Sequence, residues 1–194
     1  GPLHVGHGRG AAVGSALANL MKAAGMNVSR EYYINDAGNQ INNLAASVNA
    51  RYLQQLGQTV EFPENGYHGH DIIETAERIV RIYGDRFLNM SEEERLKEFR
   101  TIALKEKLAA LKEDLEAFNV TYDEWFSEQT LHDANAIKNA CDLLTERGYL
   151  YEEGGALWLK ATEYGDDKDR VVIRDNGVPT YFAADIAYHQ DKYA

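Results

Sequence analysis

The sequence predicts an α/β fold that opens with one half of a nucleotide-binding domain. Three observations support this: a glycine-rich start leads into an apolar repeat with helical spacing, a short run of strand-forming residues follows, and a second helical repeat comes next. Residues 1–57 are therefore expected to fold as helix–strand–helix with a phosphate loop in front. This order is typical of a mononucleotide-binding half that lacks its first strand.

The first helix is predicted from about Gly8 to Ala24. Its apolar residues recur at helical spacing: Val13, Ala16, Leu17, Leu20, Met21 and Ala24. The opening GPLHVGHGRG is predicted to be a loop in which glycines allow close approach to a ligand. The exposed N–H groups and dipole of a helix N-terminus favour phosphate, and His4 and His7 can face the same anion. The alternative is a tag remnant followed by a surface helix.

A strand is predicted over Val28–Ile34, and a second helix to about Leu56. Polar residues gather at the junction between them: Asn35, Asp36, Asn39 and Gln40. Ligands of open α/β sheets bind at the carboxyl ends of strands, so this junction is a candidate substrate-side site. Alternatively, Asp36 is only the N-cap of the helix.

Three further helices are predicted in the middle of the chain. One begins at Asp71, and a long one begins after Ser91, which forms a capping box with Glu94. The long helix carries a stripe expected to pack in a core: Leu104, Leu108, Leu111, Leu115 and Phe118. The third helix is predicted from about Asp133 to Arg147.

Short strands are predicted after residue 148. Tyr149–Tyr151 and Ala156–Lys160 flank a Gly-Gly pair, and Val171–Arg174 precedes the turn sequence Asp-Asn-Gly. Residues 180–182 are expected to be extended, with a helix from Ala183.

Charge is distributed unevenly. The net charge of −11 argues against a surface adapted to nucleic acid. Residues 1–57 hold four basic and two acidic residues, whereas the other 137 hold 16 and 29, which indicates a boundary near Gly57. No apolar run has membrane-spanning length and no secretory leader is seen, so a cytoplasmic protein is expected. The single cysteine, Cys141, is expected to pack in a core beside Ile137 and Leu144.

Two polar motifs are interpreted as surface features. The YHGH sequence at 67–70 offers two histidines with no further ligand nearby, which makes a poor zinc site. The DDKDR sequence at 166–170 is interpreted as a solvated charged turn. Neither motif predicts a metal.

The stretch TYFAADIAYH at 180–189 places Tyr181 and Asp185 four residues apart, hence on one face if the helix expected from Ala183 extends back to Tyr181. Its other neighbours are apolar, so Asp185 is expected to be partly buried. A buried carboxylate needs a partner, which a cationic ligand would supply. The alternatives are a helix cap or an ion pair with an arginine of the protein.

Several stretches resemble a known family. GPLHVGHGRGAAVGSAL resembles the first signature of class I aminoacyl-tRNA synthetases, and HVGH at 4–7 matches the "HIGH" element. HVGH alone is shared with related nucleotidyltransferases. YYINDAGNQI, DEWFSEQTLHD and RVVIRDNGVPTYFAADIAYHQDKY resemble the bacterial arginyl-tRNA synthetase branch. The resemblance covers essentially the whole chain.

The resemblance implies a role for each matched residue. His4 and His7 would contact the ATP phosphates and stabilise the transition state of adenylation. Gly6 and Gly8 would belong to the same ATP site. ATP would arrive with Mg²⁺, and no structural metal is implied.

The resemblance also implies that Tyr181 and Asp185 recognise the guanidinium of arginine. The partners would then be arginine, ATP and arginine tRNA, with no role in DNA or membrane binding. Residues 1–57 would form the first half of a Rossmann-like catalytic fold, residues 58–178 a helix-rich α+β connective insertion, and residues 179–194 the start of the second half.

On this interpretation the chain is an incomplete catalytic domain and is expected to be inactive alone. The family's KMSK-type loop and anticodon-binding domain would lie outside it. The alternatives are another class I synthetase, a small-molecule nucleotidyltransferase, or a non-catalytic structural fragment.

Overall fold

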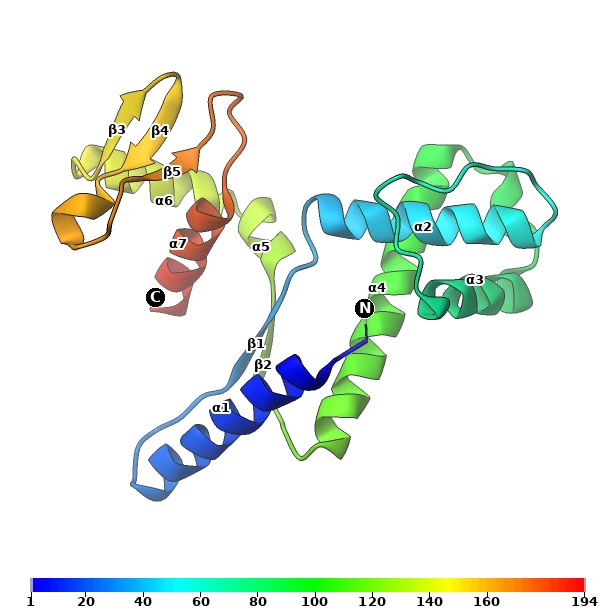
Figure 1. The fold of residues 1–194 in the computed structure, drawn as a ribbon, viewed down its shortest axis with the longest axis horizontal. Helices are drawn as coiled ribbons and strands as arrows, with labels where there is room; N and C mark the ends of the chain where they lie inside the picture. Colours follow the sequence, from blue (N-terminus) through cyan, green and yellow to red (C-terminus); the bar gives the residue numbers. More distant parts are fainter. Residues whose placement is uncertain (1, 194) are drawn as a thin grey trace. The chain divides into compact units, whose positions relative to one another are not determined.

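The computed structural model describes residues 2–193 and shows a mixed α/β chain (Figure 1). In chain order the elements are α1 (Val5–Ala23), β1 (Glu31–Ile34), α2 (Asn39–Gln55), α3 (His70–Tyr83), the 3-10 turn η1 (Arg86–Asn89), α4 (Glu92–Ala117), β2 (Glu124–Ser127), α5 (Glu128–Asp133), α6 (Ala136–Glu146), β3 (Leu150–Glu153), β4 (Ala156–Leu159), the 3-10 turn η2 (Ala161–Tyr164), β5 (Arg170–Ile173) and α7 (Tyr181–Lys192). No helix of residues 2–193 is both long and apolar enough to cross a membrane.

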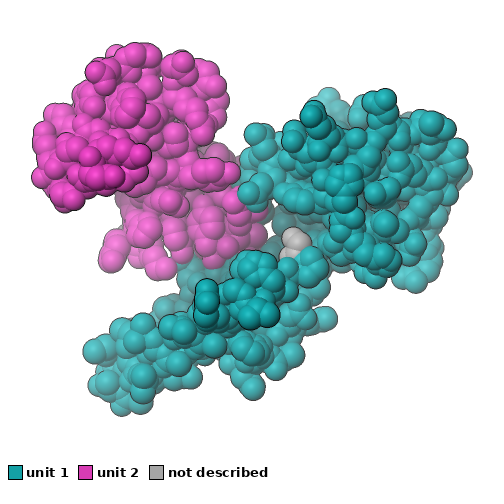
Figure 2. All heavy atoms as spheres, viewed as in Figure 1, with its two compact units in different colours: residues 1–32, 36–125 teal, residues 33–35, 126–194 magenta. Residues whose placement is uncertain are grey.

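The chain forms two compact units (Figure 2). The first contains the described residues up to Tyr32 together with Asp36–Trp125, and the second contains Tyr33–Asn35 together with those from Phe126 onward. β1 and β2 pair as a two-stranded sheet, and each strand contributes residues to both units. The domain limits at residues 57 and 178 stay a prediction, because a compact unit is not the same thing as an insertion into a nucleotide-binding fold.

The core of the first unit lies where α2 packs against α3 and α4 (Figure 1). Tyr52 is fully buried there, and its ring meets those of Phe87 and Phe99 edge-on, with centroids 6.1 and 5.0 Å away. Its hydroxyl donates to the carbonyl of Gly84 at 2.9 Å, so the buried polar atom is satisfied. This cluster is what holds the helical part of the unit together.

The long helix α4 begins as predicted but buries a different face. Ser91 and Glu94 form the capping box, because the Ser91 hydroxyl accepts from the Glu94 N–H and the Glu94 carboxylate accepts from the Ser91 N–H. The predicted core stripe is only partly correct: Leu115 is buried, Leu104, Leu108 and Leu111 are half-buried, and Phe118 is 53% exposed. The helix buries Phe99 and Ala103 instead, in its first half, which is where α2 packs on it.

Helix α1 starts at Val5, three residues before the predicted position, so the glycines that follow are helical rather than in a loop. Its apolar residues remain largely exposed, with Val13 65% and Leu20 69% accessible, and Ala18 is the one buried residue of the helix. Helical spacing therefore identified the helix, but no other element of residues 2–193 covers its apolar face.

The second unit is built on the antiparallel sheet β3–β4–β5, with α6 and α7 packed beside it (Figure 1). β3 and β4 pair from Leu150↔Leu159 to Glu153↔Ala156. The turn between them is the predicted Gly154–Gly155, where φ is +59° and +79°, a conformation that favours glycine. Cys141 is buried in the core of this unit, as predicted, and burial raises the pKa of its thiol.

Other element boundaries also differ from the predictions. α6 begins at Ala136 rather than Asp133, because Asn135 adopts a left-handed φ of +52° and separates it from α5. α7 begins at Tyr181, so Tyr181 and Phe182 are helical rather than extended. The first strand is shorter than predicted and starts at Glu31.

Candidate active site

His4 and His7 lie together at the N-terminus of α1 and cap it reciprocally. The Nδ1 atom of His4 accepts from the Gly6 N–H at 3.1 Å, and Nδ1 of His7 accepts from the His4 N–H at 3.2 Å. The two rings stack with centroids 3.7 Å apart and an angle of 19° between their planes. Because each neutral ring uses Nδ1 as an acceptor, its proton is on Nε2, so both rings carry an N–H donor at the other edge.

The predicted glycine loop is therefore wrong in form, since HVGH is a cap followed by the first helical turn. Gly6 has a steric role there: a Cβ at this position would lie 2.9 Å from Cε1 of His4. A side chain at residue 6 would push the His4 ring away from the cap. A Cβ added at Gly8 would meet no atom within 4 Å, so the space beside this residue is open. The Gly8 N–H donates to the His4 carbonyl at 3.1 Å.

The junction after β1 holds Asp36 in a buried position, 7% exposed. Asp36 is not the N-cap of α2: that position belongs to Gly38, at a φ of +76°. Asn35 and Gln40 are exposed at the same junction. Arg100 of α4 donates from Nη2 to the Asp36 carbonyl at 2.9 Å. Sequence reasoning missed Arg100, because nothing local signals a contact across 64 residues.

Tyr181 and Asp185 lie one turn apart on α7, as predicted from their spacing. The expected burial of Asp185 is wrong, since its side chain is exposed and Tyr181 is 67% exposed. The face of α7 that packs is made of small residues, Ala183, Ala184 and Ala187, which turns Asp185 toward solvent.

Neither protein-internal alternative for Asp185 holds. The N-cap of α7 is Thr180, whose hydroxyl donates to the Val171 carbonyl at 2.8 Å. Within residues 2–193 the Asp185 carboxylate has no ion-pair partner. An exposed carboxylate of this kind is available to a cationic ligand.

A buried carboxylate lies in the same unit as Asp185. Glu128, at the start of α5, is 7% exposed and is hydrogen-bonded to Tyr33. Burial, followed by the charge and hydrogen bond of Glu128 and then the charge of Asp185, raises the pKa of Tyr33 well above its usual range. Sequence reasoning missed both residues, although Tyr33 lies only two positions before Asn35, the first residue of the junction that it singled out.

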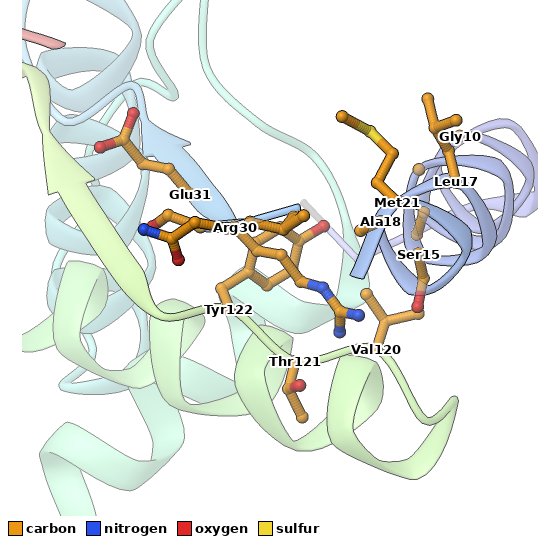
Figure 3. Close-up of a pocket in the computed structure, with 15 residues that line it drawn as sticks. Gly10, Ser15, Leu17, Ala18, Met21, Arg30, Glu31, Val120, Thr121 and Tyr122 are labelled. Atoms are coloured by element: carbon orange, nitrogen blue, oxygen red, sulfur yellow. The ribbon is translucent and has the colours of Figure 1, made fainter. Parts of the chain in front are cut away.

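A cavity of about 450 Å³ lies in the first unit, between one face of α1, the approach to β1 and residues 120–122 (Figure 3). Arg30 contributes to its wall; it donates from its backbone N–H to Asp123 at 2.7 Å and from its guanidinium to Asn19. None of the predicted site residues lines this cavity.

The two polar motifs lie at the surface. His68 and His70 are exposed, and Nδ1 of His70 lies 3.2 Å from Glu74. Arg170 pairs with Asp166 and Asp167, while Asp169 accepts from Thr162 and from the Tyr151 hydroxyl. The charged turn therefore makes more ion pairs and hydrogen bonds than the predicted solvated turn. Among residues 2–193 no group of three or more His, Cys, Asp or Glu side chains could hold a metal ion.

Comparisons with known proteins agree on one family. The family model described as "tRNA synthetases class I (R), catalytic domain" matches residues 1–194. An arginine–tRNA ligase of Carboxydothermus hydrogenoformans is 58% identical over 193 residues, with all of this chain and 35% of the relative covered. The corresponding ligase of Moorella thermoacetica is 55% identical, with 34% of it covered.

A crystal structure described as an arginyl-tRNA synthetase from Campylobacter jejuni superposes with a TM-score of 0.88 at 39% identity. It covers all of this chain, which corresponds to 42% of that structure. The chain thus spans about a third of the length of the curated relatives that it matches. The match over all 194 residues shows that the chain belongs to the catalytic-domain family of class I (R) tRNA synthetases.

Proposed function

We propose that the protein to which this chain belongs activates arginine with ATP and then esterifies it to the 3′ end of arginine tRNA. The observation that carries the proposal is the exposed carboxylate of Asp185, which lies one turn from Tyr181 and has no ion-pair partner among residues 2–193, in a chain of the class I (R) family. The relatives named arginine–tRNA ligase support the same substrate. Neither another class I synthetase nor a small-molecule nucleotidyltransferase requires a guanidinium-binding pair at these two positions.

In the activation step, the arginine carboxylate attacks the α-phosphorus of ATP and pyrophosphate leaves. Negative charge builds on the phosphoryl oxygens as the new bond forms. We assign the Nε2–H donors of His4 and His7, together with the N-terminus of α1, to those oxygens. The stacked arrangement holds both donors in place before ATP arrives, so little reorganisation is needed during the reaction.

Gly6 and Gly8 are proposed to belong to the ATP site. Gly6 keeps the His4 ring against the helix cap, and the open space at Gly8 lets a ligand approach the helix backbone. Mg²⁺ is proposed to enter with ATP as part of the substrate, and we assign it no ligand in this chain.

Asp185 is proposed to accept two parallel hydrogen bonds from N–H groups of the arginine guanidinium. This arrangement recognises the positive charge of the substrate and also sets the direction in which its side chain points. Tyr181, one turn earlier on the exposed face of α7, adds a hydroxyl or a ring face to the same group. The carboxylate has no cation of residues 2–193 to release first.

At the junction after β1, we propose a substrate-side role for the exposed Asn35 and Gln40 and a structural role for the buried Asp36. Residues 58–178 are proposed to be the connective insertion of the catalytic fold, with residues 1–57 and 179–194 belonging to its two halves. We also propose a cytoplasmic location, which follows from the use of tRNA.

The test is arginine-dependent ATP–pyrophosphate exchange, together with tRNA charging, in the natural full-length protein and in the 194-residue chain. Exchange is measured with and without arginine tRNA and with each of several other amino acids. Arginine-specific exchange by the full-length protein is the expected result, with little or no charging by the 194-residue chain. Exchange with a different amino acid, or none with any, would contradict the proposed function.

A further inference from the structure

The turn between β1 and α2 is held by a side chain from a distant part of the chain. Arg100, in the first half of α4, donates from Nη2 to the carbonyl oxygen of Asp36 at 2.9 Å. Both residues belong to the first unit, and Asp36 is 7% exposed. A buried carbonyl that loses its donor is costly, so this contact favours one position of the turn.

The turn has little in its own sequence that would fix it. The N-cap of α2 is Gly38, whose φ of +76° and ψ of −161° suit glycine, and glycine has no side chain that could cap the first turn of the helix. Ala37 is buried and anchors the turn by packing. The position of the turn therefore depends on groups from outside it, and Arg100 is one of them.

Gln40 is an exposed side chain whose position depends directly on this turn. It lies in the first turn of α2, two residues after the cap. The next residue, Ile41, is buried, which fixes the rotation of the helix about its axis. A shift of residues 36–38 would move the start of α2, and the amide of Gln40 would move with it.

The direction of β1 brings this turn back toward the start of α1. α1 runs away from the His4–His7 cap, and β1 runs in the opposite direction (Figure 1). The carboxyl end of β1 is thus directed toward the end of α1 that carries the proposed phosphate donors. Ligands of open α/β sheets bind at this edge, which places the turn on the substrate side.

We propose that Arg100 is a positioning residue for the activation step: by holding the Asp36 carbonyl it sets the start of α2, so that the Gln40 amide is in place for the reacting substrates. This inference rests on the proposed function and deepens it. In this role Arg100 acts through Gln40 and touches no substrate itself. An amide both donates and accepts hydrogen bonds, and misplacing such a group by about 1 Å can slow a reaction on the order of 10²-fold.

The test uses Arg100→Met, Gln40→Ala and the double variant in the natural full-length protein. Arg100→Met keeps much of the apolar length of the side chain and removes the guanidinium. The matched control is Arg95→Met. Arg95 lies on the same helix, is also half-buried, and donates from Nε to Asn49 at 2.6 Å. Asn49 is about three helical turns along α2 from the cap, so this control removes an arginine between the same two helices without touching the turn.

In ATP–pyrophosphate exchange, Arg100→Met and Gln40→Ala are each expected to lower kcat about tenfold, while the KM values for ATP and arginine stay within about threefold. The double variant should be no slower than Gln40→Ala alone, because Arg100 acts through Gln40. Arg95→Met should be less stable than wild type in urea denaturation but should keep the wild-type kcat. A purely structural role of Arg100 would give the same pattern as Arg95→Met.

Three results would overturn the inference: a folded Arg100→Met variant with the wild-type kcat, a double variant about tenfold slower than Gln40→Ala, or an Arg95→Met variant as slow as Arg100→Met. Should Arg100→Met not fold, Arg100→Lys decides by the same criteria, since it keeps the charge and loses the guanidinium.

Wild-type exchange separates this inference from the proposed function. Arginine-specific exchange by the wild type with an unaffected Arg100→Met variant removes only the role of Arg100. A wild type that activates a different amino acid removes the proposed substrate, and the Arg100 comparison is then made with that amino acid. A wild type with no exchange at all removes both.

Discussion

His4 and His7 stack face to face with 3.7 Å between ring centroids, and the Nδ1 atom of each accepts a hydrogen bond from a backbone N–H at the start of α1. The pair therefore has a structural task, capping the helix, in addition to the proposed contact with phosphate. Any substitution that removes an imidazole removes both, so a useful experiment has to separate the cap from the chemistry.

Replacing His4 or His7 by Ala in the full-length protein is expected to slow arginine activation on the order of 10²-fold, as for loss of other transition-state donors. The Ala variants should also lose about 1 kcal/mol of stability with the cap. His4→Asn restores a capping side chain but no imidazole, so it should recover stability and not rate. Exchange kinetics and thermal unfolding measure the two effects.

The matched control for this experiment is His68→Ala, an exposed histidine outside α1. It should leave both the rate and the stability unchanged. A His4→Asn variant that activates arginine at the wild-type rate would show that the histidine serves only as a cap.

Local features of the fold could be predicted from the sequence because their causes are local. The capping box at Ser91 and Glu94 and the Gly154–Gly155 hairpin were both correct, since each depends on residues a few positions apart. The buried face of α4 was not predictable in this way. A leucine stripe shows which residues can be buried, but α2 packs at Phe99 and Ala103, and that choice depends on a partner far away in the chain.

The candidate site divides along the same line. The spacing of Tyr181 and Asp185 predicted a shared helix face, and the structure confirms it. The exposure of Asp185 depends on which face of α7 packs against the rest of the unit. Its apolar neighbours in the sequence therefore led to a wrong prediction, namely that Asp185 is partly buried. Glu128 and Tyr33 lie 95 positions apart, and no local pattern announces such a pair.

Arg100 is expected to hold the junction after β1 in place, because it donates to the carbonyl of the buried Asp36. Arg100→Met keeps much of the side chain's apolar length and removes this donor. The free energy of unfolding should fall by roughly 1–3 kcal/mol, the usual cost of a buried acceptor that loses its partner. Urea denaturation of the full-length protein measures the change.

Arg81→Met, at an exposed position on α3, is the control for Arg100→Met and should be close to neutral. If the two variants unfold at the same urea concentration, the contact with Asp36 contributes nothing to stability.

Glu106 should make stability depend on pH. Burial raises its pKa, but hydrogen bonds from Arg78 at 2.9 Å and Thr75 at 2.6 Å outweigh burial, and the pKa is lowered. A lowered pKa contributes stability that is complete above the unfolded value of about 4.3 and is lost as the pH falls through the folded value. Glu106→Gln should therefore be less stable than wild type at pH 7, with a difference that shrinks below about pH 4.

The pH series is measured by urea denaturation, with Glu113→Gln, an exposed acid on the same helix, as the control. For Glu113→Gln, the difference in stability from wild type should not shrink as the pH falls. A Glu106→Gln difference that is constant from pH 7 to pH 3 would mean that the charge of Glu106 is irrelevant to stability.

Asp185→Asn gives the sharpest test of which amino acid the protein uses. The exposed carboxylate caps nothing and has no ion-pair partner among residues 2–193, so the substitution should leave the melting temperature unchanged. Once arginine covers it, however, the same group becomes half of a charged pair. Recognition of arginine should then weaken by roughly 2 kcal/mol, about 30-fold in kcat/KM, while the KM for ATP stays the same.

Asp191→Asn, on the exposed part of the same helix, should have no effect. Lysine should remain a poor substrate for the wild-type protein, because an ammonium group cannot match the parallel pair of donors that a guanidinium offers. Unchanged catalytic efficiency of a well-folded Asp185→Asn variant would mean that arginine is recognised elsewhere in the full-length protein.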